Sequence, residues 1–150
     1  MSLWDLSLPD VLDEWDEIDK RGTYLPGIRA LCLEDRFYLL VKACSRVDAL
    51  HPWIYARCRE VERAPDDHLD LWAREHYKST IITFAGVIQE ILRNPEITIA
   101  IFSHTKGIAR KFFRQIRFEL ESNETLKAAF PDILFQSPAK EAPRWAEETG

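Results

Sequence analysis

A lysine and a serine, Lys78 and Ser79, stand where an apolar run with helical spacing begins. Residues 68–73 before them are predicted as a strand, so the order is strand, tight loop, Lys-Ser, helix. A loop that closes onto a helix start leaves several backbone N–H groups unpaired, and the helix dipole points with them toward one spot. An anionic phosphate satisfies these groups together, so the pattern predicts a phosphate-binding loop.

Each polar group in this loop has an expected task. We expect the backbone amides from Glu75 to Ser79 to surround the phosphates of ATP. Lys78 would hold the β- and γ-phosphates, and the Ser79 hydroxyl would bind Mg²⁺. The expected binding residues are Glu75, His76, Tyr77, Lys78, Ser79 and Thr80.

The loop departs from the general phosphate-loop pattern at two positions. Glycine is expected six residues before the lysine and directly before it, where this chain has Trp72 and Tyr77. Glycine is favoured there because the backbone approaches phosphate closely and can need a positive φ. The alternative interpretation is an ordinary strand–turn–helix with a surface lysine.

A longer string of residues resembles a known family. Residues 71–84 read Leu-Trp-Ala-Arg-Glu-His-Tyr-Lys-Ser-Thr-Ile-Ile-Thr-Phe, and residues 101–105 read Ile-Phe-Ser-His-Thr. Together they resemble the ATPase domain of tailed-phage terminase large subunits, the motors that package viral DNA. The resemblance runs from about Leu31 to the end of the chain and is specific at 69–84 and 97–105.

The resemblance implies a function for the whole chain, the coupling of ATP hydrolysis to DNA translocation. It makes Arg74, four positions before the lysine, a further expected binding residue and, with Lys78, a candidate catalytic residue that stabilises charge near the γ-phosphate. It implies ATP and Mg²⁺ as cofactors and double-stranded viral DNA as a partner. The small terminase subunit, the portal and neighbouring large subunits are further implied partners.

Hydrolysis of this type also needs an acidic pair at the end of an apolar strand. The chain has no such pair after Phe102. In the terminase family this Walker B segment and the nuclease domain lie further downstream. We therefore expect a fragment that lacks both and that does not hydrolyse ATP alone.

Composition limits the classes of protein to consider. The chain has 150 residues, 46% of them hydrophobic, and a net charge of −5. This size suits one domain, and the negative charge restricts any DNA-binding surface to a local patch. No run is long enough to span a bilayer, and the acidic N-terminus lacks a secretion signal. The three cysteines have no metal-ligand spacing, so we expect buried free thiols and a reducing cytoplasm. The resemblance to terminases implies that this is the cytoplasm of a host cell, with the protein encoded by a phage or prophage.

The remaining elements follow from apolar spacing. We expect a helical N-terminal lead at 1–63 and a partial ATPase core at 64–150. Helices are predicted near 8–20, 28–45, 48–63, 79–94, 104–123 and 126–134, and strands at 68–73 and 97–102, with the lip of another strand at 145–148. The predicted fold class is α/β, an incomplete RecA-like P-loop NTPase whose parallel sheet is built on one right-handed βαβ unit.

Two charged surfaces carry further hypotheses. The acidic helix near 8–20 is either a solvated helix packed on the domain or a docking arm for a partner. The helix at 104–123 carries a basic stripe, whose residues are either DNA-phosphate contacts or a solvated face: Lys106, Arg110, Arg114 and Arg117. His104 could contact nucleotide or DNA, or be satisfied by backbone.

Two other functions remain open on sequence alone. The loop could belong to another P-loop ATPase, such as a helicase-like enzyme. The chain could also be a non-enzymatic module that has lost nucleotide and binds only DNA or a protein partner.

Overall fold

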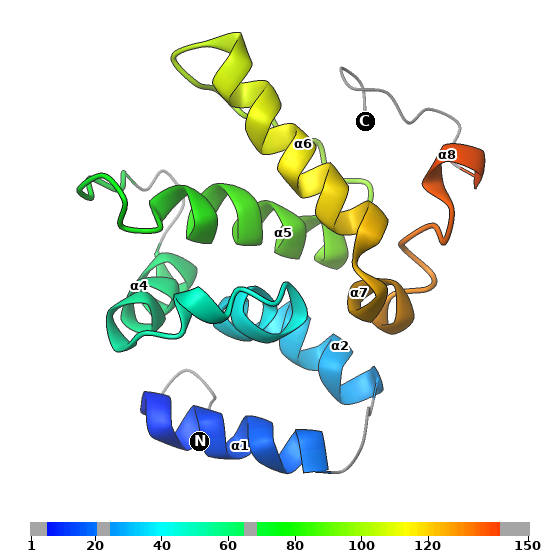
Figure 1. The fold of residues 1–150 in the computed structure, drawn as a ribbon. Helices are drawn as coiled ribbons and strands as arrows, with labels where there is room; N and C mark the ends of the chain where they lie inside the picture. Colours follow the sequence, from blue (N-terminus) through cyan, green and yellow to red (C-terminus); the bar gives the residue numbers. More distant parts are fainter. Residues whose placement is uncertain (1–5, 21–24, 65–68, 142–150) are drawn as a thin grey trace.

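The structure, a computed structural model, describes residues 6–20, 25–64 and 69–141. Helices are stacked in layers, with α1 (Leu8–Lys20) at the bottom of Figure 1 and α6 (Lys106–Ser122) crossing the top. Between them lie α2 (Leu25–Glu34), α4 (Pro52–Arg63) and α5 (Val87–Arg93). The shorter elements are α3 (Arg36–Tyr38), η2 (Leu39–Ala43), η3 (Val47–Ala49), η4 (Thr80–Gly86), α7 (Glu124–Ala129) and α8 (Pro138–Glu141).

The predicted α/β fold class is wrong for the described residues, which contain helices and no strand. The expected parallel P-loop sheet and its βαβ unit are therefore absent there. Residues 69–73 and 97–102 are non-helical, but neither segment forms a strand. The expected strand at 145–148 lies outside the described residues.

Helix packing explains why residues 97–102 resemble a strand in sequence. Ile97, Ile99 and Ile101 line an apolar groove with residues of α5 and α6, including Val87 and Ile116. Apolar residues at every second position indicate that one face of a segment is apolar. They do not show that its backbone is hydrogen-bonded to a neighbouring strand. The isoleucine side chains are only partly covered by the groove, since Ile99 is 36% exposed, and among the described residues no segment forms a ladder with the backbone of 97–102.

Most of the predicted helices are present, with boundaries set by capping residues. The helix predicted at 28–45 is interrupted at Asp35, whose side chain accepts a hydrogen bond from the Tyr38 amide and begins α3. Pro52 occupies the first turn of α4, and His51 caps it. Thr105 caps α6, and helical backbone runs from Lys78 to Arg93 through the π-helical η4.

One hydrophobic cluster joins helices from both halves of the chain. Trp15 of α1 lies against Phe37 and Tyr38, with ring centroids 5.6 and 5.1 Å apart. Phe84 of η4 and Ile88 of α5 are buried in the same cluster. The helix that follows the loop is therefore held on its inner face by the core.

A buried polar network lies beside this cluster. Asp35 is fully buried and accepts a hydrogen bond of 2.8 Å from Arg59, which also bonds Glu62 at 3.1 Å. Glu62 in turn accepts the backbone N–H of Arg36 at 2.6 Å. Burial raises the pKa of Glu62, an effect that the hydrogen bond from Arg36 and the charge of Arg59 oppose. These charges are paired, as burial requires.

The network also reaches the helix that follows the loop. Arg36 donates through Nε to Gln89 Oε1 at 3.1 Å, and Gln89 donates to the carbonyls of Cys32 and Leu33, both at 3.2 Å. A Cβ on Gly86 would lie 3.3 Å from the Arg36 guanidinium, so the absence of a side chain permits this close approach. The position of α5 is thus specified by polar contacts as well as by apolar packing.

The three cysteines are buried free thiols, as predicted. Burial raises the pKa of Cys32 to about 12 and raises those of Cys44 and Cys58 further. Among the described residues, no helix combines the length and apolar character needed to cross a bilayer.

Replacing Asp35 with alanine removes a buried carboxylate that both caps α3 and neutralises Arg59. We expect Asp35→Ala to lower the free energy of unfolding by about 3–5 kcal/mol, because the buried Arg59 guanidinium loses its Asp35 carboxylate. Urea unfolding measures this loss. Asp13→Ala, at an exposed position of α1, is the control and should change stability by less than about 0.5 kcal/mol. Similar values for the two variants would contradict the role assigned to the network.

Candidate phosphate-binding loop

The loop before Lys78 ends in a helix start with unpaired amides. The first hydrogen bond within the helix runs from the Ile81 amide to the Tyr77 carbonyl, at 2.8 Å. The amides of Lys78, Ser79 and Thr80 therefore have no partner inside the helix. Within the described ranges, these three amides are recorded in no hydrogen bond to a loop carbonyl or side chain. Two of them, the amides of Lys78 and Ser79, belong to the set from Glu75 to Ser79 that was expected to surround phosphate.

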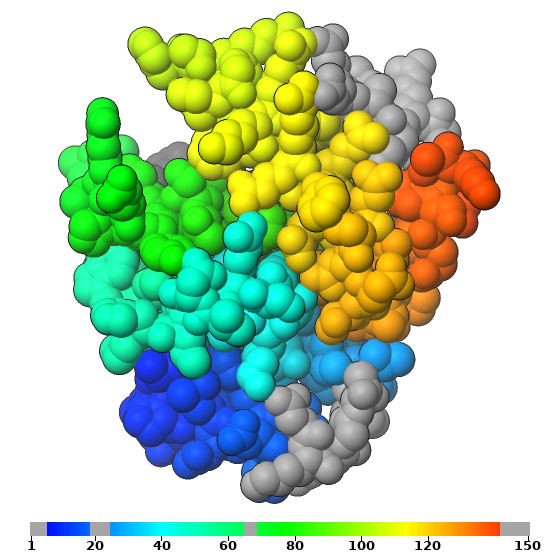
Figure 2. Space-filling model, viewed as in Figure 1, coloured from blue at the N-terminus to red at the C-terminus, as the bar shows by residue number. Residues whose placement is uncertain are grey.

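The residues of the loop surround one hollow of about 360 Å³. All of the predicted loop residues line it, together with two that precede them: Trp72, Ala73, Arg74, Glu75, His76, Tyr77, Lys78, Ser79 and Thr80. Figure 2 shows this part of the chain, in green, standing out from the left side of the molecule. The predicted loop residues therefore lie around one hollow, and no sheet lies beside it among the described residues.

Two residues of the loop have left-handed backbone conformations. Glu75 has a φ of 64° and Tyr77 a φ of 58°. Such values are uncommon for residues with a side chain, and they cost about 1–2 kcal/mol per residue. Tyr77 occupies the predicted glycine position and adopts the conformation for which glycine is favoured there. Tyr77 therefore adopts a positive φ at a cost that glycine would not have.

Lys78 and Ser79, which have the most specific predicted roles, lie at the helix start. Lys78 is half-buried, and its Nζ donates a long hydrogen bond of 3.4 Å to the Asp70 carbonyl. A bond of that length is weak, so an anion in the hollow can compete for the ammonium group. Ser79 is exposed and its side chain makes no capping hydrogen bond, which leaves the hydroxyl available to a ligand.

Arg74 lies in the exposed turn of the loop and lines the hollow. The alternative for this residue was an ion pair with Asp70 or Glu75. The structure records no ion pair between Arg74 and either acid, all three being described residues. Arg74 therefore borders the hollow next to Glu75 without a recorded ion pair to it.

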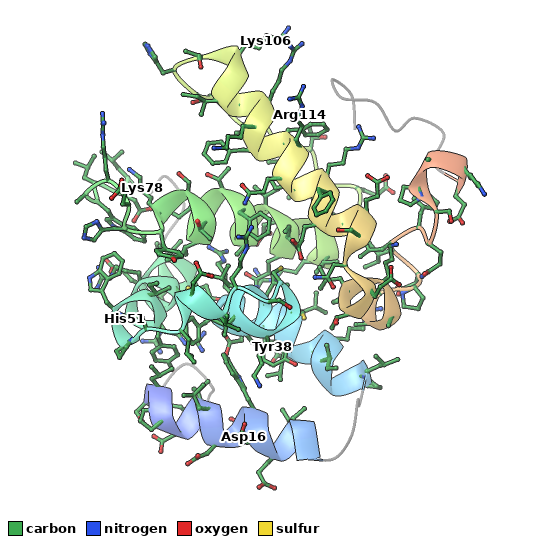
Figure 3. All side chains as sticks on the ribbon, in the orientation of Figure 1. Asp16, Tyr38, His51, Lys78, Lys106 and Arg114 are labelled. Atoms are coloured by element: carbon green, nitrogen blue, oxygen red, sulfur yellow. The ribbon has the colours of Figure 1, made fainter. Side chains whose placement is uncertain are left out.

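Aromatic contacts hold the loop against the start of α4. Trp53 makes edge-to-face contacts with Trp72 and with His76, at centroid distances of 5.6 and 5.4 Å. His76 also uses Nδ1 to bridge to the Arg74 carbonyl, 2.7 Å away. In Figure 3 His51, which caps α4, lies on the same side of the molecule as Lys78. Trp53 is 37% exposed, and its ring lies against the loop.

A second support comes from the turn before α4. The Tyr77 hydroxyl donates a hydrogen bond of 2.5 Å to Asp48 Oδ2. This hydrogen bond, with minor contributions from burial and the charge of Asp48, raises the pKa of Tyr77. Sequence reasoning missed Asp48, because a contact between residues 29 positions apart leaves no local pattern.

The predicted basic stripe lies on α6 and not at the hollow. Lys106 and Arg114 are exposed, Arg110 and Arg117 are half-buried, and none of the four lines the loop. Arg117 lies 3.9 Å from Glu121 on the same helix. Figure 3 places Lys106 at the upper end of α6 and Arg114 further along it. His104 is exposed and precedes this helix.

The described parts of the chain contain no cluster of three or more His, Cys, Asp or Glu side chains that could hold a metal ion. Comparisons of the chain with protein-family models, with curated proteins and with solved structures find no match.

The aromatic contacts lead to a prediction about the loop itself. Trp53→Ala removes two ring contacts, each worth about 0.5–1.5 kcal/mol, and should let the loop open more often. We expect trypsin to cleave after Arg74 about tenfold faster in this variant. Phe118→Ala, which truncates an exposed aromatic on α6, is the control and should leave the rate unchanged. Equal rates in all three proteins would show that Trp53 does not hold the loop.

Proposed function

We propose that the hollow binds the phosphates of Mg²⁺-ATP, and that the chain serves as the ATP-binding part of a DNA-packaging motor of the terminase large-subunit class. One observation carries the proposal. The consecutive residues Arg74 to Thr80 surround a single hollow at a helix start whose first amides have no partner in the helix.

Electrostatics favours an anion at this position. The unpaired N–H groups of a helix start carry partial positive charge, and the helix dipole adds to it. Lys78 contributes a full positive charge at the same end of the helix. Glu75 also lines the hollow and opposes the anion, while Arg74 beside it offsets that charge. A polyphosphate that brings Mg²⁺ would further reduce the repulsion from Glu75.

The side chains at the hollow suit a nucleotide triphosphate in particular. The Ser79 hydroxyl would bind Mg²⁺ alongside phosphate oxygens, and Lys78 would hold the β- and γ-phosphates. Arg74 would approach the γ-phosphate, where charge develops during its transfer. These roles need the loop and the helix start, and they do not depend on a sheet.

The wider role rests on the sequence resemblance described above. A terminase role implies double-stranded DNA as the translocated substrate and the host cytoplasm as the place of action. It also implies contact with the small terminase subunit, the portal and neighbouring large subunits. A helicase-like ATPase with the same loop is the main alternative.

A second candidate function is supported by a separate surface. The basic residues of α6 follow one another at spacings of four and three, which places them on neighbouring turns of one face. A row of this kind suits the phosphates of a DNA backbone. DNA binding without nucleotide would leave α6 as the functional surface and the loop as a structural turn.

The proposal predicts stabilisation by nucleotide. Mg²⁺-ATP at about 100 times its Kd should add about 2.7 kcal/mol and raise the Tm by about 5–10 °C. Lys78→Ala should abolish most of this shift, because it removes the charge at the hollow. Lys140→Ala removes the same charge at the exposed end of α8, away from the loop in Figure 1, and should keep the shift. An equal shift in Lys78→Ala and Lys140→Ala would contradict nucleotide binding at the loop.

The α6 surface makes its own prediction. Arg110→Glu with Arg114→Glu should weaken binding to double-stranded DNA and lower the slope of log K against log salt concentration by about 2, one for each lost phosphate contact. Fluorescence anisotropy over a salt series measures both quantities. Lys42→Glu with Lys140→Glu makes the same change in net charge on other elements. If the two double variants bind DNA equally, the α6 stripe is a solvated face.

A further inference from the structure

Tyr77 is held in a costly backbone conformation at the point where the loop meets the helix. Its φ is 58°, and Lys78, which follows immediately, lines the same hollow. A tyrosine left to itself would favour negative φ by about 1–2 kcal/mol. The conformation therefore needs a contact that keeps it in place.

We infer that Asp48 is a positioning residue for the phosphate loop: its hydrogen bond to the Tyr77 hydroxyl holds Tyr77 left-handed and keeps the amides that follow directed into the hollow. The inference deepens the proposed function and rests on it for the identity of the ligand. Asp48 does not line the hollow, so it would act through Tyr77 and not by contact with phosphate.

Asp48 lies on a turn that is closed by backbone hydrogen bonds. Asp48 belongs to the short helical turn η3, in which the Ala49 amide bonds the Arg46 carbonyl at 2.9 Å and the Leu50 amide bonds the Val47 carbonyl at 3.1 Å. Ala49, directly after Asp48, is fully buried. Tyr77 thus donates to a carboxylate on an ordered turn, and the raised pKa of its hydroxyl agrees with a bond to that carboxylate.

If Asp48 acted only through its negative charge, removing it would strengthen phosphate binding. A carboxylate near a phosphate site repels the ligand, so its loss by charge alone would tighten binding. Loss of a positioning contact would weaken binding instead. The direction of the change therefore separates the two mechanisms.

Glycine at position 77 supplies the matching control. Glycine adopts positive φ at little cost and has no hydroxyl to donate. In a Tyr77→Gly chain the turn would form without help, and Asp48 would have nothing to hold. Asp48→Ala should then matter in the native background and not in the glycine background.

The experiment measures affinity for Mg²⁺-ATP and for inorganic tripolyphosphate in four proteins: the native chain, Asp48→Ala, Tyr77→Gly and the double variant. We expect Asp48→Ala to weaken both ligands about fivefold in the native background and less than about twofold in the glycine background. Tyr77→Phe, which removes only the hydroxyl, should match Asp48→Ala. Tighter binding by Asp48→Ala, or equal weakening in both backgrounds, would overturn the inference.

Thermal unfolding of the same four proteins without ligand tests the conformational coupling independently. Asp48→Ala should lower the Tm by about 2–4 °C in the native background and by less than 1 °C in the glycine background. Equal Tm losses would overturn the inference. A native chain that binds neither ligand would instead overturn the proposed function, while these Tm values would still decide whether Asp48 holds Tyr77.

Discussion

The buried charges around Asp35 are the constraint on which the arrangement of this chain depends. Asp35, Arg59 and Glu62 are nearly or fully inaccessible to water, and each has a charged partner within 3.1 Å. A buried charge that loses its partner costs several kcal/mol, so α2, α3 and α4 can pack in few other ways. Arg36 and Gln89 extend this requirement to α5. Helical backbone runs without a break from Lys78 through η4 into α5, so the contacts of α5 with the network also fix the position of the helix start next to the loop.

The energetically unfavourable backbone conformations of this chain lie in and next to the loop. The helix after Lys78 passes through a π-helical segment, and two loop residues with side chains have positive φ. Both features are unfavourable in themselves, and both are found more often at functional sites than elsewhere. The contacts that offset them come from a different part of the chain, namely Trp53 and Asp48. The helix after the loop is thus anchored in the core, and these two residues outside the loop contact His76 and Tyr77 within it.

Local features of the molecule could be predicted from the sequence, and long-range contacts could not. Helical periodicity and capping residues identified the helices of the core, because both signals lie within one turn. The residues from Arg74 to Thr80 were predicted together and are found around one hollow, since a loop of consecutive residues needs no tertiary information. Trp53 and Asp48 support that loop across the fold, and no local pattern marks them.

The failure of the predicted sheet has the same cause. The β-branched residues at 97–102 predicted a strand, but a strand also needs a neighbouring backbone. In the described residues the isoleucines at 97, 99 and 101 instead line a groove with residues of α5 and α6. Periodicity in one segment cannot distinguish a strand partner from a helix groove, so element type was predicted less reliably there than for the helices.

The proposed function depends on the backbone amides of Lys78, Ser79 and Thr80, which would donate hydrogen bonds to a bound anion. Titrating ¹⁵N-labelled protein with inorganic tripolyphosphate, and following each backbone amide by NMR, tests this directly. The account predicts saturable shifts that are largest at these three amides and small at the α7 amides of Leu126 and Lys127, which already have hydrogen-bond partners. Shifts confined to α6, or no saturable shift at residues 78–80, would contradict it.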